Sequence, residues 1–197
     1  MPKGIPLTEE EIDRRRHEIF QSAVPLIMNQ GFANTSMQEI AQAAGVGKST
    51  LYDYFPTKHH VLLFVFMEEL EILQEQTEGI AVQNLPVQEK LSKVLEAHLE
   101  FLINNKIFFR EISMEAVHLE QVGQQSILKK RYAYQDLLRN ILDQGVKEGV
   151  FRPINTRLVV RSLIAILEAL AYTTRPTGAP QEMLADVLEL FMHGIEP

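Results

Sequence analysis

The chain has 197 residues, of which 46% are apolar and 23% charged, a balance typical of a folded globular protein and not of a disordered one. It has no cysteine, which excludes disulfide scaffolds and thiolate metal sites, and its longest apolar run, residues 61–67, is far below the roughly 18 residues that span a bilayer. The N-terminus lacks a secretory signal pattern and the formal net charge is −7, so we expect a soluble, cytoplasmic protein.

Apolar residues recur at helical spacing from end to end, and no stretch alternates apolar and polar residues as a half-buried strand would. Glycines and prolines place several helix ends, with Gly31 after the first helix, Pro56 after the third and Gly79 after the fourth. The expected helices cover about 9–30, 37–44, 48–54, 58–78, 86–104, 106–120, 124–147, 155–173 and 180–194. The predicted fold class is therefore all-α, with about nine helices.

These helices divide into two expected domains. Residues 1–58 form a small N-terminal three-helix domain, residues 59–197 form a larger helical domain, and the fourth helix, 58–78, connects them. The first domain carries a net charge of −1 and the second −6. Because an acidic chain disfavours nucleic acid as a whole, any DNA-binding function must rest on the local placement of residues.

The second and third helices carry the strongest local pattern. Ser36 and Glu39 have the spacing of a capping box, which fixes the start of the second helix. Gly45 fits the left-handed position that ends such a helix, Val46 can cover the turn, and Gly47 is a tolerated cap for the third helix. The pattern predicts two short helices joined by a tight turn.

Helical spacing then separates the two faces of the third helix. Leu51 and Phe55, one turn apart, point toward the core. The side chains left to project outward are polar or aromatic: Lys48, Ser49, Thr50, Tyr52 and Tyr54. Any small helical bundle can contain such a turn. Here, however, the helix cap, the turn, the buried residues and the exposed residues all fit the same pair of helices. We interpret the pair as a DNA-binding helix-turn-helix.

A phosphate-binding loop is the competing interpretation of Gly47, Lys48 and Ser49, which match the end of its motif. The motif requires a glycine at position 42, which is Gln42, and a preceding strand where this chain has a helix. We therefore reject a nucleotide-binding loop.

The same segment resembles the DNA-binding signature of the tetracycline-repressor (TetR) family. The residues that carry the resemblance are Gly31, Phe32, Thr35, Ser36, Ile40, Ala41, Ala44, Gly45, Val46, Lys48, Thr50, Leu51, Tyr52, Tyr54, Phe55 and Lys58. The resemblance implies a homodimeric, ligand-responsive transcriptional regulator. The chain departs from the family at Gly47, where a serine is common, and at Pro25, which should kink the first helix.

DNA contacts follow from this assignment and from the physics of phosphate binding. Thr35 and the amides near Ser36 lie at a helix N-terminus, where Lys58 adds a cation, and Tyr54 offers a hydroxyl to the backbone. The residues expected to enter or flank the major groove follow Gly47: Lys48, Ser49, Thr50 and Tyr52. Residues 14–16 are all arginine and either add phosphate attraction or form a solvated helix face.

In the larger domain, a few polar residues interrupt apolar helix stripes, as in many small-molecule sites. The candidate ligand-binding residues are His98, Phe101, Met114, His118, Tyr134 and Glu168. The alternative makes each of them an ordinary core or interface residue. We expect no metal and no cofactor, because His59 and His60 are adjacent and no histidine–carboxylate set has ligand spacing.

The last helix has a broad apolar stripe, formed by Leu184, Val187, Leu188 and Phe191. Pairing the last two helices with those of a second copy would form a four-helix dimer interface. Packing within one chain is the alternative.

Together these features predict a regulator, most often a repressor in this family, that binds a near-palindromic double-stranded DNA operator as a homodimer. A small, largely apolar effector releases it. A helical ligand-binding or protein-interaction module without DNA binding is the alternative. An enzyme is disfavoured, because neither a nucleophile–base set nor paired catalytic carboxylates can be assembled from the sequence.

Overall fold

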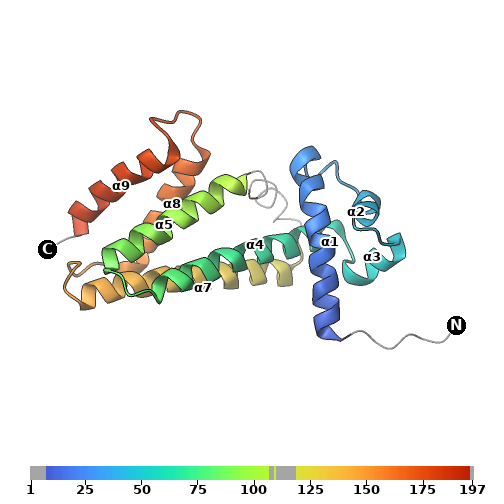
Figure 1. Ribbon diagram of the computed structural model, residues 1–197, viewed down its shortest axis with the longest axis horizontal. Helices are drawn as coiled ribbons and strands as arrows, with labels where there is room; N and C mark the ends of the chain where they lie inside the picture. Colours follow the sequence, from blue (N-terminus) through green and yellow to red (C-terminus); the bar gives the residue numbers. More distant parts are fainter. Residues whose placement is uncertain (1–7, 107–108, 110–118, 196–197) are drawn as a thin grey trace. The chain divides into compact units, whose positions relative to one another are not determined.

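The computed structural model describes residues 8–106, 109 and 119–195 (Figure 1). In this part of the chain all regular structure is helical, which confirms the all-α class. The eight helices described are α1 (Glu9–Gln30), α2 (Met37–Ala43), α3 (Lys48–Tyr54), α4 (Lys58–Ala81), α5 (Val87–Asn104), α7 (Gln121–Lys147), α8 (Thr156–Tyr172) and α9 (Pro180–Ile195). Most of the helix expected at 106–120 lies outside the described residues.

The described residues form two compact units. Residues 8–68, 109 and 119–123 belong to the first, and residues 69–106 and 124–195 belong to the second. Helix α4 contributes its first half to the first unit and its second half to the second.

The first unit is built on α1, which packs against α2, and on α2, which packs against α3. Its core contains fully buried aliphatic side chains, among them Ile19, Ile27, Ile40 and Leu51. A capping box starts α1, because the Thr8 amide donates to the Glu11 carboxylate at 2.7 Å and the Glu11 amide donates to Thr8 Oγ1 at 3.2 Å. The helix continues through Pro25 to Gln30.

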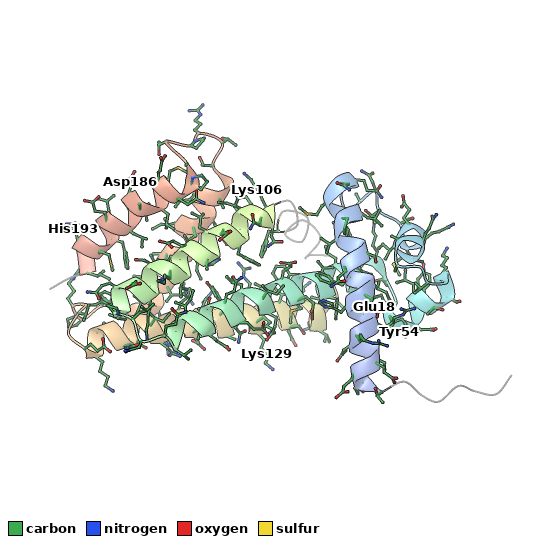
Figure 2. All side chains as sticks on the ribbon, viewed as in Figure 1. Glu18, Tyr54, Lys106, Lys129, Asp186 and His193 are labelled. Carbon is green, nitrogen blue, oxygen red and sulfur yellow. The ribbon has the colours of Figure 1, made fainter. Side chains whose placement is uncertain are left out.

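The second unit packs α5 against α8 and α9, and α8 against α9. Side chains fill the space between these helices (Figure 2). The buried stripe of α5 includes Leu91, Val94, Leu95 and Leu99, each at most 1% exposed. Burying this stripe stabilises the unit, at roughly 25 cal/mol per Å² of apolar surface removed from water.

Helix α4 runs three residues beyond its expected end at 78 and passes through Gly79. Lys90, 7% exposed on α5, explains where it stops, because its Nζ donates to the carbonyl of Ala81 at 2.7 Å. A cation at a helix C-terminus satisfies an unpaired carbonyl and favours the helix dipole. A lysine from α5 therefore caps the end of α4, a partner that the local sequence of α4 does not contain.

Gly145 lies where a side chain has no room. A Cβ atom built on it would overlap the ring of Phe151, which is 1% exposed. The Gly145 carbonyl also accepts the amides of Val150 and Phe151 at 2.9 and 3.0 Å, which holds the chain close at the end of α7. Gly79, in contrast, has open space around its Cβ direction.

Replacing Gly145 by alanine should therefore destabilise the protein by about 1–3 kcal/mol, because Phe151 must move out of its buried position. Gly79→Ala is the matched control and should leave stability unchanged or raise it by up to about 1 kcal/mol, since alanine is the better helix former. Urea unfolding followed by circular dichroism measures both. Equal stabilities of the two variants would show that the Gly145–Phe151 contact is not a constraint.

Candidate nucleic-acid interface and ligand site

Helix α2 begins with the predicted capping box. The Ser36 amide and hydroxyl contact the Glu39 carboxylate at 2.8 and 2.7 Å, and the Glu39 amide donates to Ser36 Oγ at 3.2 Å. These hydrogen bonds from Ser36 lower the pKa of Glu39, which keeps a negative charge at this helix end. The amides of Met37 and Gln38 are the other donors of the first turn that an external anion could use.

The turn between α2 and α3 has the predicted left-handed glycine. Gly45 has φ +64°, its amide donates to the Gln42 carbonyl at 3.2 Å, and the Val46 amide donates to the Ala41 carbonyl at 2.9 Å. This pair of bonds is a Schellman motif, which requires a residue that tolerates positive φ.

Gly47 follows the turn as the cap of α3, with an extended backbone at φ −67° and ψ 148° and no side-chain hydrogen bond. A Cβ on Gly47 would meet Thr50 Oγ1 at 3.6 Å and Ser49 Oγ at 3.9 Å, which are ordinary contacts. Glycine is therefore not required at this position, unlike at Gly45.

Helix α3 has one buried and one exposed face. Leu51 and Phe55 are 0% and 2% exposed, and the Phe55 ring packs edge-on against Phe64 at 5.5 Å between centroids. The other side chains of the helix reach the surface: Lys48, Ser49, Tyr52 and Asp53 are exposed, and Thr50 and Tyr54 are half-buried. Of the residues predicted to read bases, Ser49 and Tyr52 thus lie at the surface and Thr50 is partly accessible.

Thr35 is placed differently from the prediction that its side chain serves a phosphate. It is 1% exposed, and its hydroxyl donates to the Gly31 carbonyl at 2.8 Å. The hydroxyl therefore closes the turn between α1 and α2. The sequence does not show whether a threonine is buried. The partner of Thr35 is the backbone carbonyl of Gly31, and every residue type has such a carbonyl.

Lys58 also has a structural role. Its Nζ donates to the carbonyls of Phe32 and Ala33 at 2.7 and 3.2 Å and lies 4.4 Å from the centre of the Phe32 ring. An ammonium group has three donor hydrogens, so one is left for a phosphate. Lys58 therefore links the start of α4 to the turn after α1, and the predicted contact with DNA would be a second role of the same ammonium group.

Two of the three arginines at 14–16 make local ion pairs on α1. Arg15 contacts Glu18, and Arg16 lies 3.5 Å from Asp13, with both pairs partly exposed. The hydrogen bond from Arg15 lowers the pKa of Glu18. Exposed pairs of this kind are weak, but they balance the arginine charge locally and favour the solvated-face interpretation.

In the second unit, two of the predicted ligand-binding residues bind each other. The Tyr134 hydroxyl and His98 Nδ1 are 3.0 Å apart, and the rings are nearly perpendicular with centroids at 5.1 Å. The residues are 6% and 5% exposed. Burial, aided by the charge of Arg131, lowers the pKa of His98 to about 3, and burial raises the pKa of Tyr134.

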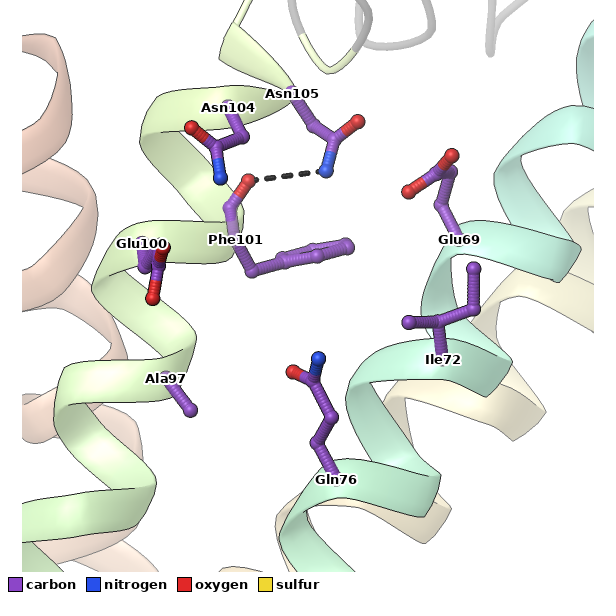
Figure 3. Close-up of a pocket in the computed structure, with 8 residues that line it drawn as sticks. All are labelled: Glu69, Ile72, Gln76, Ala97, Glu100, Phe101, Asn104 and Asn105. Carbon is purple, nitrogen blue, oxygen red and sulfur yellow. Dashed lines mark hydrogen bonds between the residues drawn. The ribbon is translucent and has the colours of Figure 1, made fainter.

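A pocket with a volume of about 220 Å³ lies between α4 and α5 of this unit (Figure 3). Phe101, a predicted ligand residue, extends its ring into it, and Asn105 Nδ2 donates to the Phe101 carbonyl at 3.1 Å. The other lining residues are Glu69, Ile72, Gln76, Ala97, Glu100 and Asn104. Sequence reasoning missed these residues, although their spacing of three and four places them along one face of each helix.

Of the other predicted ligand residues that the structure describes, His98, Tyr134 and Glu168 do not line this pocket. Glu168 is partly exposed and lies 3.8 Å from Arg131. Met114 and His118 lie outside the described residues.

The residues of α9 that are predicted to form the dimer interface differ in how far they are exposed in the single chain. Leu184 is 2% exposed within the single chain and packs in its core, so its part in a dimer interface stays a prediction. Val187, Leu188 and Phe191 are half-buried, while Leu190 is 77% exposed. A broad apolar stripe on a helix can pack against its own chain on one side and against a second copy on the other. The sequence alone does not show which of its residues are covered by the same chain.

None of the helices described is long and apolar enough to cross a membrane. In the described part of the chain no three histidine, aspartate or glutamate side chains are grouped as a metal ion would need.

Comparisons with known proteins agree with the geometry of the first unit. Residues 19–64 match the sequence model of the bacterial regulatory proteins of the tetR family, and residues 84–195, more than half of the chain, match that of the tetracyclin repressor-like C-terminal domain. The fatty acid metabolism regulator protein of Bacillus subtilis strain 168 is 26% identical over 184 residues, which cover 90% of this chain and 94% of that protein.

Two solved structures extend the likeness to the fold. The TetR family transcriptional regulator PfmR from Thermus thermophilus has a TM-score of 0.74 and 28% identity, and the alignment covers 91% of this chain and 99% of PfmR. AibR, solved with isovaleryl coenzyme A and operator DNA, has a TM-score of 0.69 and 22% identity over 89% of this chain and 97% of AibR. With both parts of the chain matched, the chain belongs to the TetR family of bacterial transcriptional regulators.

Proposed function

We propose that this regulator is a repressor that binds a near-palindromic operator as a homodimer and leaves it when a small effector binds. The observation that carries the proposal is the Schellman turn at Gly45, which ends α2 and leaves the polar face of α3 exposed. In the proposed division of labour, residues 1–58 bind DNA, and residues 59–197 bind the effector and dimerise. A gel-shift with the DNA flanking the gene tests it, and no shift would favour a helical module without DNA binding.

The proposed DNA contacts divide into two kinds. Ser49, Thr50 and Tyr52 on α3 read base edges in the major groove, with Lys48 beside them. The Tyr54 hydroxyl, the third hydrogen of Lys58 and the amides at the start of α2, next to Ser36, contact phosphates. The buried hydroxyl of Thr35 acts indirectly, by holding the start of α2 in place.

The proposed dimer surface uses α8 and α9. Leu158 on α8 is 61% exposed and Leu190 on α9 is 77% exposed, and Leu188 and Phe191 are partly accessible. Large apolar side chains at such exposure lose contact with water when a second copy covers them. A two-fold symmetric pair also places two recognition helices on one face of a palindrome.

The proposed effector is a small, largely apolar acyl compound. One relative that covers 90% of this chain is named a fatty acid metabolism regulator, and the pocket that Phe101 lines lies in the unit proposed to bind the effector. AibR, which has the same fold, was solved with isovaleryl coenzyme A. Helix α4 would carry the response, because it holds pocket residues at 69–76 and begins at Lys58 in the first unit.

Thr50→Ala should change which operator bases are preferred, by about 1–3 kcal/mol at the position that Thr50 reads. Tyr54→Phe, which removes a proposed phosphate contact from the same helix, should weaken binding to matched and mismatched operators alike. Competition binding with single-base operator variants measures both effects. A common loss factor for Thr50→Ala across all operators would contradict its role in reading bases.

Gly47→Ser should tighten binding to every operator sequence by up to about tenfold, because the new hydroxyl can donate to a phosphate without a steric cost. Since serine adds no charge, the dependence of affinity on salt should stay the same. Gly47→Ala fits the same space and adds no donor, so it should give no gain. Equal affinities of the serine and alanine variants would show that position 47 lies away from the backbone of the DNA.

Leu188→Arg should produce monomers that bind the operator poorly, because a charge at the centre of the proposed interface would be buried without a partner. Gln181→Arg adds the same charge at an exposed position on α9 and should remain dimeric. Light scattering at micromolar concentration measures the oligomeric state. A monomeric unmodified protein, or a dimeric Leu188→Arg variant, would contradict the proposed interface.

A further inference from the structure

Two histidines follow Lys58 in the first turn of α4, and the DNA contacts proposed above use neither of them. His59 and His60 are half-buried, like Lys58 itself. An imidazole can donate a hydrogen bond to a phosphate, and its charge changes near physiological pH. The pair therefore lies beside a proposed phosphate contact and can carry a charge that depends on pH.

The His60 ring is held against Thr57, the residue that precedes α4. Nδ1 of the ring lies 2.8 Å from Thr57 Oγ1, and the His60 amide donates to the Thr57 carbonyl at 3.1 Å. In the described part of the chain, the hydrogen bonding of this ring is confined to Nδ1. The two ring nitrogens lie on different sides of an imidazole, so Nε2 points away from Thr57 and remains for an external partner.

The contact with Thr57 is compatible with a charged ring. A hydroxyl group can donate to a neutral Nδ1 or accept a hydrogen from a protonated one. His60 can therefore take up a proton without losing its bond to Thr57. In the protonated ring Nε2 also carries a hydrogen and is a donor.

His59 is held by a different partner. Its ring lies 5.4 Å, between centroids, from the ring of Phe32, and Lys58 Nζ lies 4.4 Å from the centre of the same ring. His59 thus packs against an aromatic side chain, whereas His60 contacts a single hydroxyl. This difference assigns the external contact to His60.

The charged and titratable side chains around the start of α4 come from three helices. They are Asp53 and Tyr54 at the end of α3, Glu39 on α2, and Lys58 and His59 on α4. The Glu39 carboxylate already accepts from Ser36 and from Gln30. Lys58 uses two of its three hydrogens on carbonyls, so a charged His60 supplies a second cation where a phosphate can bind.

We propose that His60 is a further phosphate contact, that its Nε2–H donates to a DNA phosphate oxygen, and that the bound ring takes up a proton from solvent. This inference rests on the proposed function, because it adds a contact to the same DNA interface. A group that binds a proton more tightly in the complex makes binding stronger as the pH falls and weaker as the pH rises. Thr57 is the positioning residue of this contact.

Binding to a short DNA duplex of arbitrary sequence tests the proposal, because phosphate contacts carry no sequence information. Fluorescence anisotropy of the labelled duplex measures the affinity of the full-length protein at about pH 6 and about pH 8. We expect binding about three- to tenfold tighter per protomer at the lower pH, since a charged donor makes the stronger hydrogen bond. The slope of log affinity against log salt should also be steeper there, by about 0.9 per protomer.

His60→Gln removes the titrating group and keeps a residue suited to the third position of a helix. It should lose the change of affinity and of salt slope between the two pH values. His60→Lys is charged at both and should bind at about pH 8 as tightly as the unmodified protein does at about pH 6. His59→Gln is the matched control and should keep the pH dependence, and thermal unfolding of each variant at both pH values checks that it is folded.

Equal affinities of the unmodified protein at the two pH values, or a pH dependence that His60→Gln retains, would overturn the proposal. Either result would leave the proposed DNA-binding function intact, since the duplex is still bound. Absence of binding to any duplex, the DNA flanking the gene included, would contradict both.

Discussion

The position of the recognition helix depends on one backbone constraint, the positive φ of Gly45. A residue with a Cβ pays a conformational cost there, and without the left-handed turn the amides of Gly45 and Val46 would lose their carbonyl partners at the end of α2. The direction of α3 follows from this turn, and the direction decides which side chains face outward. The exposed Ser49 and Tyr52 are thus a consequence of the turn as much as of their own chemistry.

Several cations of this acidic protein are used to hold helices together. Lys58 binds two carbonyls after α1, Lys90 binds the end of α4, and Arg15 and Arg16 on α1 are paired with neighbouring carboxylates. On α3 the exposed cation is Lys48. In the proposed operator complex, neutral donors and backbone amides would therefore share the phosphate contacts with Lys58.

The sequence was informative where local chemistry decides the structure. The capping box at Ser36, the glycine turn at Gly45 and the buried pair Leu51 and Phe55 follow from spacing within a few residues, and all are present. The same reasoning predicted the all-α class and the limits of most helices. Local patterns are sufficient there because each feature satisfies its own hydrogen bonds or buries its own face.

Long-range partners could not be predicted in the same way. The end of α4 depends on Lys90, the burial of Thr35 depends on a carbonyl at Gly31, and Leu184 is covered by the rest of its own chain. The pocket is lined by residues of two helices, among them Glu69, Gln76 and Asn104. Its lining could be identified only when the relative position of α4 and α5 was known. His98 and Tyr134 were chosen as isolated polar residues, and their mutual hydrogen bond is a property of the packed unit.

The central claim is that paired recognition helices read a two-fold symmetric site. Sequencing the DNA fragments that the purified protein captures from its own genome, followed by footprinting, tests it most directly. The account predicts one shared near-palindrome, with half-site centres about 34–36 Å apart or a multiple of that distance, protected on one face. Fragments without a shared sequence, or a single unrepeated half-site, would contradict it.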